Sequence, residues 1–143
     1  MQGVIFSILA GAAMSLQGVM NTRLGQRIGT MEANVIVQCT AAVLSLAALA
    51  VNHSGDFGAL GQTPKLYWLG GVLGLVITVT VMLGIRDLSP TVSIAVILIS
   101  QLLVAALIDA FGLMDSEKVA FNWTKYAGLG LMLGGVALFK LET

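Results

Sequence analysis

Long apolar runs occupy most of this chain, and the few charged residues stand between them. One run reads VSIAVILISQLLVAALI and contains no charge. About 20 apolar residues in a helix are enough to cross the hydrocarbon core of a membrane. Of the 143 residues, 57% are hydrophobic and 10% are charged, against about 25% charged in ordinary soluble proteins. The chain is therefore predicted to be an all-α membrane protein, and a disordered chain or a cytosolic enzyme is excluded.

Five runs are long and apolar enough to be predicted as transmembrane helices. We expect helices and not strands because an open strand edge cannot be satisfied in hydrocarbon, and the runs do not alternate as barrel strands do. Pro90 suits the first turn of a helix, and Ser89 before it suits the N-cap. We expect one transmembrane domain over 1–143, with no signal peptide. The predicted helices cover about 3–22, 33–51, 67–85, 90–113 and 124–139.

Lysine and arginine give almost no preference for one orientation, although they normally gather on the cytoplasmic side. With five spans, one face would carry Lys65, Lys118 and Lys125. The opposite face would carry Arg23, Arg27, Arg86 and Lys140. Either one helix or one arginine pair decides the topology, or the chain inserts both ways. Two oppositely oriented copies would form the ten-helix inverted repeat that is typical of secondary transporters.

Polar side chains inside the first span fall on one face of the predicted helix. Met14, Gln17 and Asn21 are spaced by three and four residues, and Ser7, Gly11 and Ser15 form a neighbouring small-residue face. Helical neighbours recur at these spacings, and small residues permit close approach of another helix. We therefore expect one face for packing and another that offers amides to a pocket.

Further polar residues lie in the second and fourth spans. Asn34 is close to a helix start, where an amide can serve as a cap, whereas Gln38 lies about one turn deeper. Gln101 is near the middle of its span, where an amide must find a partner or line water. Asp109 is either a functional ionisable group, for example in proton or cation coupling, or an acid at a helix end paired with a loop cation.

Glycine pairs in the third and fifth spans are predicted to pack helices or join subunits. Gly70 with Gly74, and Gly130 with Gly134, follow the small-xxx-small spacing of close helix contacts. No metal site or cofactor is expected, because the lone His53 has no second histidine or cysteine beside it and Cys39 is expected to be a small buried residue. An enzyme is not expected either, since no nucleophile, paired carboxylates or base can be assembled.

Several segments resemble the YdcZ-like inner-membrane proteins of the drug/metabolite transporter superfamily. The stretch LQGVMNTRLGQRIGTMEAN is similar to the family's opening, and YWLGGVLG and SQLLVAALIDAFG are similar to its third and fourth helices. The ending GLGLMLGGVALF is similar to the last helix of the wider superfamily. The first helix lacks the glutamate of the four-helix exporters, so their proton-coupled mechanism is not carried over.

The resemblance implies five-helix subunits that pair antiparallel, as one dual-topology protein or as two oppositely oriented paralogues. It also implies transport across a bacterial inner membrane. We therefore expect a secondary transporter or exporter of a small polar molecule, working as an antiparallel dimer. Its expected partners are a second copy or a paralogue, lipid and an unknown small substrate, with no nucleic acid. The alternative is a membrane subunit that assembles with a partner without transporting anything. The expected pocket is lined by Met14, Gln17, Asn21, Gln38 and Gln101.

Overall fold

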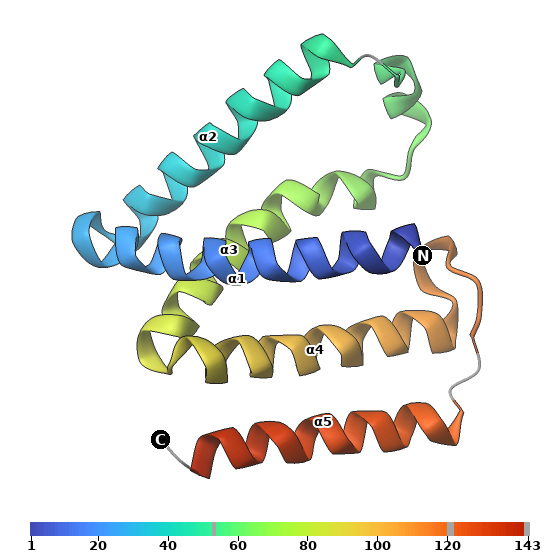
Figure 1. Cartoon of the computed structure of the whole chain (residues 1–143). Coiled ribbons are helices and arrows are strands. Elements are labelled where there is room, and N and C mark those ends of the chain that lie inside the picture. Colours follow the sequence, from blue (N-terminus) through green and yellow to red (C-terminus); the bar gives the residue numbers. More distant parts are fainter. Residues whose placement is uncertain (53, 120–121, 142–143) are drawn as a thin grey trace. The chain divides into compact units, whose positions relative to one another are not determined.

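The computed structural model describes residues 1–52, 54–119 and 122–141, and within them all regular structure is helical. The chain divides into two compact units, 1–86 and 87–143. The elements, labelled in Figure 1, are α1 (Gln2–Ile28), α2 (Thr30–Val51), the 3₁₀ helices η1 (Phe57–Gln62) and η2 (Lys65–Leu69), α3 (Gly70–Asp87), α4 (Pro90–Phe111), η3 (Leu113–Asp115) and α5 (Trp123–Leu141).

Four helical segments are long and apolar enough to cross a membrane within the described part of the chain. They are α1, α2, η2 together with α3, and α4. The prediction of an all-helical membrane protein is therefore confirmed. Helix α5 is not among the four, because its first turn carries a lysine and four glycines dilute its apolar residues. The fifth span, and with it the five-helix count, stays a prediction.

Helix α1 continues beyond the predicted end of the first span. The prediction ended at residue 22, before Arg23 and Arg27, but the helix runs on to Ile28. Charged residues end the part of a helix that can lie in hydrocarbon, whereas arginine itself favours helix. A helix of this length measures about 40 Å, which exceeds the roughly 30 Å of a membrane core. Helix α1 is therefore longer than the membrane core is thick.

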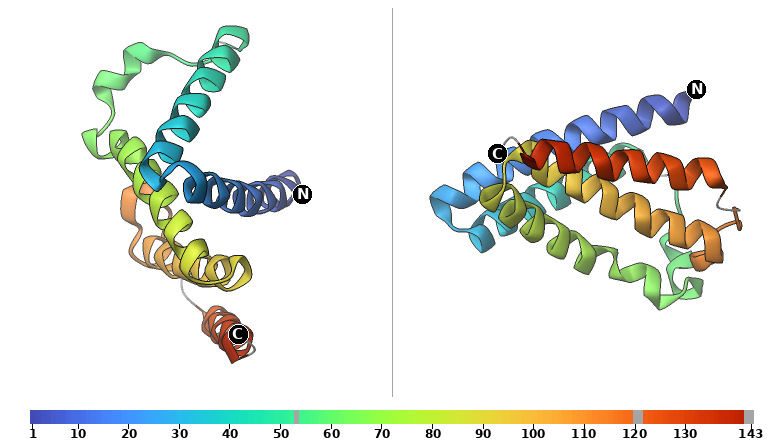
Figure 2. Two further views of the ribbon diagram at one scale, coloured as in Figure 1. Left: turned by 90° about the vertical axis from the view of Figure 1, so that its left-hand side faces the viewer. Right: turned by 90° about the horizontal axis from the view of Figure 1, so that it is seen from below.

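A single residue, Gly29, turns the chain from α1 into α2. Its φ of 105° and ψ of 146° belong to a region that is essentially restricted to glycine. The Gly29 N–H donates to the Gly25 carbonyl at 2.9 Å, and the Gly29 carbonyl accepts from the Ala33 N–H at 3.0 Å. From this turn α1 and α2 diverge, as Figures 1 and 2 show. The space between the two helices therefore widens with distance from the turn.

The first unit has its core where the second half of α1, the start of α2 and the end of α3 meet. Ala33, Met82 and Ile85 are buried there. A methyl group at Gly18 would lie 2.9 Å from Ile85 Cδ1, and one at Gly25 would lie 3.4 Å from Met82 Sδ. The absence of these two side chains lets α1 approach α3 closely.

The second unit is built on α4 and α5, which contact each other. Ser89 Oγ accepts a hydrogen bond from the Val92 N–H at 3.3 Å, and Pro90 occupies the first turn. The predicted N-terminus of this helix is confirmed. The helix ends at Phe111, two residues before the predicted end, because Gly112 takes the left-handed conformation.

Candidate functional site

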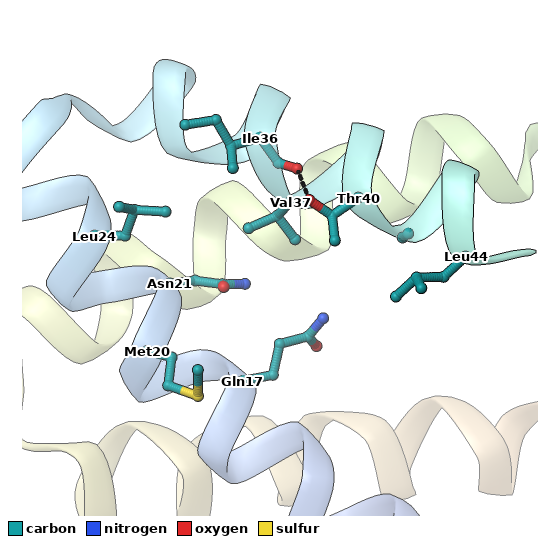
Figure 3. Close-up of a pocket in the computed structure, with 9 residues that line it drawn as sticks. Gln17, Met20, Asn21, Leu24, Ile36, Val37, Thr40 and Leu44 are labelled. Atoms are coloured by element: carbon teal, nitrogen blue, oxygen red, sulfur yellow. Dashed lines mark hydrogen bonds between the residues drawn. The ribbon is translucent and has the colours of Figure 1, made fainter.

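A groove of about 480 Å³ lies between α1 and α2 in the first unit. Its walls are mostly apolar and its polar atoms come from two amides and one hydroxyl, as in many small-molecule sites. Figure 3 shows the lining side chains. They are Gln17, Met20, Asn21, Leu24, Ile36, Val37, Thr40, Ala41 and Leu44.

The two amides of the groove come from successive turns of α1. Gln17 and Asn21 are four residues apart, and Figure 3 shows both side chains directed into the space between the helices. Asn21 is 9% exposed and Gln17 is exposed. Neither amide makes a hydrogen bond within the part of the chain that the structure describes. Each amide can therefore offer both a donor and an acceptor to a ligand.

The hydroxyl on the α2 side of the groove is already engaged. Thr40 Oγ1 donates to the Ile36 carbonyl at 2.8 Å, the bond drawn in Figure 3. Polar recognition in the groove therefore falls chiefly to Gln17 and Asn21. The aliphatic side chains around them form the apolar part of the walls.

The other predicted pocket residues of the first unit lie outside this groove. Met14 is exposed and is not part of its lining. Gln38 is half-buried on the side of α2 that faces α3. A methyl group built at Gly74 of α3 would lie 3.7 Å from its Nε2. The structure thus brings Gln17 and Asn21 together and directs Gln38 elsewhere.

Gln101 belongs to the second unit, where it lines a shallow cavity of about 410 Å³ with Ser100, Val104, Ala105 and Ile108. Its side chain is exposed, and the cavity is otherwise almost wholly apolar. Its role in a pocket stays a prediction.

Asp109 lines another cavity of the second unit, of about 480 Å³ between α4 and α5. Lys125 from the first turn of α5 lines the same cavity, and both side chains are half-buried. An acid and a base of opposite charge in one apolar cavity support the interpretation that Asp109 has a structural cationic neighbour. Ion coupling by Asp109 stays a prediction.

The predicted glycine contacts are mostly open in the structure. Among the described residues, nothing lies within 4 Å of a methyl group at Gly70, Gly130 or Gly134, and only Gln38 lies near Gly74. Ser7 and Gly11 are exposed and Ser15 is half-buried, and both hydroxyls are bonded to carbonyls of α1. The role of these glycines and serines in contacts with another chain stays a prediction.

Sequence reasoning did not single out Gly18 and Gly25, which make the close contacts with α3. Gly18, Thr22 and Gly25 follow one another at spacings of four and three residues, which places them on one face of α1. That spacing was the signal that could have identified them.

The expectation that Asn34 caps α2 is wrong. The N-cap is Gly29, and no side chain caps this helix end. Asn34 is only 3% exposed, and its Oδ1 is buried without a hydrogen-bond partner in the described part of the chain. A buried acceptor left unpaired costs about 1–3 kcal/mol. Asn34 therefore destabilises the packed end of this unit.

Replacing Asn34 by leucine is expected to raise the free energy of unfolding by about 1–3 kcal/mol, since the unpaired amide is removed at similar volume. Thermal denaturation of the purified protein in detergent measures this, with Gln17→Leu as the comparison because Gln17 is exposed in the open groove. A fall in stability for Asn34→Leu would show that this amide has a partner.

Residues 1–52, 54–119 and 122–141 contain no group of three histidine, cysteine, aspartate or glutamate side chains that could hold a metal ion. The expectation that Cys39 is buried is wrong: it is exposed on α2, in a segment apolar enough to face lipid. His53 lies outside the described residues.

A family model described as "Putative inner membrane exporter, YdcZ" matches residues 2–138. The chain belongs to this family. The resemblance found in the sequence is thereby confirmed, and the YdcZ family together with the four apolar helices makes this a multi-pass inner-membrane protein. No curated protein and no solved structure matches the chain.

Proposed function

We propose that this YdcZ-family protein exports a small polar molecule across the inner membrane. The observation that carries the proposal is the groove of about 480 Å³ between α1 and α2, whose lining is mostly apolar. The amides of Gln17 and Asn21 in this lining make no hydrogen bond to the residues that the structure describes. An amide offers both hydrogen-bond directions and no charge. The substrate class that suits it is a neutral or singly charged molecule with hydroxyl, amine or amide groups.

The working unit in this proposal is an antiparallel dimer of five-helix subunits. Two features support it. The basic residues are divided three to four between the predicted faces, and small-residue faces such as Ser7, Gly11 and Ser15 are open to a partner. A groove that is open at the surface of one chain would become enclosed when a second chain covers it. No covalent chemistry or cofactor has a part in this mechanism.

The same open faces would also suit a subunit that assembles with another membrane protein and transports nothing. A release assay separates the two functions. Proteoliposomes loaded with a defined mixture of amino acids, sugars, nucleosides and polyamines are incubated under a proton gradient, and the retained compounds are quantified by mass spectrometry. We expect at least one compound to leave faster from proteoliposomes than from empty liposomes. Equal retention of every compound would favour the subunit function.

A further inference from the structure

A second cavity of the first unit, of about 250 Å³, lies at the junction of α1, α2 and α3. It shares no lining residue with the groove of the candidate site. Its lining consists of Thr22, Gly25, Gln26, Thr30, Met82 and Arg86.

We infer from its position in the chain that this cavity lies at the membrane surface. Gln26 and Thr30 flank the Gly29 turn between two apolar helices, and Arg86 is in the last turn of α3. Arg23 and Arg27 occupy the final turns of α1, the part that exceeds the thickness of the hydrocarbon core. Charged side chains at a helix end lie among headgroups and water. The cavity therefore opens toward the layer of lipid headgroups.

The lining offers hydrogen-bond donors. Gln26 Oε1 accepts a hydrogen bond from Arg23 Nη1 at 3.3 Å, so the amino group of Gln26 is the part of this amide that can donate to a ligand. Arg86 contributes a guanidinium, whose five N–H groups allow it to keep a partner within the protein and still donate to a ligand, and Thr30 contributes a hydroxyl. Thr22, in contrast, donates its hydroxyl to the Gly18 carbonyl at 2.7 Å. A cavity lined by such donors suits an anion.

The charge of this surface is also positive near the cavity. The segments 22–33 and 82–87 together contain three arginines and two acids, which are Arg23, Arg27, Arg86, Glu32 and Asp87. The carboxylate of Glu32 lies beside Gly29, over the start of α2, where an acid is favoured by the helix dipole. Glu32 is not part of the cavity lining. An anion in the cavity would therefore meet Arg86 directly and Arg23 through Gln26.

We propose that this cavity binds the phosphate group of an anionic membrane lipid, with Arg86 and Gln26 as donors. A guanidinium is well matched to phosphate oxygens, which it can bind with two parallel hydrogen bonds. The cavity volume of about 250 Å³ accommodates a phosphate group but leaves no room for the acyl chains, which would extend along the exposed apolar faces of the helices. The bound lipid would join the ends of α1, α2 and α3 at one membrane surface.

Binding is measured on the full-length protein in detergent, with phosphatidylglycerol, phosphatidylcholine or inorganic phosphate as the added probe. The readouts are the number of lipids retained in native mass spectrometry and the apparent dissociation constant from titration. We expect wild type to retain phosphatidylglycerol in preference to phosphatidylcholine. Arg86→Gln should weaken phosphatidylglycerol binding by about tenfold or more, the effect of losing a charge-assisted hydrogen bond. Lys65→Gln removes a cation from η2 and should leave binding unchanged.

A second variant, Gln26→Met, covers the case in which Arg86→Gln fails to fold, because Gln26 is exposed and its replacement by another unbranched helix former is tolerated. It too should weaken phosphatidylglycerol binding. Equal retention of the two lipids, or equal losses in Lys65→Gln and Arg86→Gln, would overturn the proposal. Competition by inorganic phosphate as strong as that by phosphatidylglycerol would overturn the assignment to a lipid and leave a site for a free anion.

Discussion

Replacing Gln17 and Asn21 together by leucine is expected to slow the release of substrate from proteoliposomes strongly. Within the described residues, these two amides are the polar side chains of the α1–α2 groove that make no hydrogen bond. Each hydrogen bond that they lose to a substrate is worth about 0.5–1.5 kcal/mol, so together they reduce binding by roughly 5- to 150-fold. Leucine keeps the volume of the side chains, so the groove retains its shape while it loses its polar atoms.

Gln62→Leu provides the matched control, because it removes an exposed amide in η1 outside the groove. We expect this variant to release substrate at the wild-type rate. Each single replacement, Gln17→Leu or Asn21→Leu, should give an intermediate rate. Full activity of the double variant would remove the groove from the transport pathway.

The second large effect is expected at Gly18, where α1 lies against α3. A methyl group at this position would lie 2.9 Å from Ile85 Cδ1 and 3.1 Å from Val81 Cγ1. The side chains of Ile85 and Val81 would have to shift to admit even a methyl group, and a leucine side chain needs more space still. Overpacking of this kind costs about 1–3 kcal/mol. We expect Gly18→Leu to lower the thermal denaturation midpoint sharply and to reduce the yield of folded protein.

Gly3→Leu controls for the general effect of putting leucine into α1. Nothing lies within 4 Å of a methyl group at Gly3, so its stability should remain within about 0.5 kcal/mol of wild type. Leucine favours helix more than glycine does in both variants, so the difference between them reports the contact with α3. Equal stability of the two variants would show that α1 and α3 do not pack as described.

The sequence predicts most of the secondary structure of this protein because membrane-crossing helices are marked by long apolar runs. The cap at Ser89 and Pro90 is likewise a local signal and was confirmed. The end of α1 was not predicted, since Arg23 and Arg27 limit the hydrocarbon span but do not interrupt a helix. The fifth span depends on a helix whose glycines and lysines weaken the apolar signal.

The candidate site could be predicted only in part. Spacing along one helix places Gln17 and Asn21 on a common face, and the structure directs both into one groove. Spacing cannot show which face of α2 meets α1, because that depends on the backbone angles of Gly29 and the packing of Ala33 near Gly25. The sequence therefore predicts that Gln38 lies in α2, but it does not predict that the side chain is on the side of α2 that faces α3.

Orientation in the membrane tests the antiparallel dimer most directly. Gly61→Cys in a Cys39→Ser background places a single thiol in η1, where nothing lies within 4 Å of the new side chain. Cells are treated with a membrane-impermeant thiol reagent before and after permeabilisation. Because lysine and arginine do not favour one orientation, we expect roughly half of the molecules to react from outside and the rest only after permeabilisation. Reaction of all molecules, or of none, from outside would contradict a dimer of oppositely oriented identical chains.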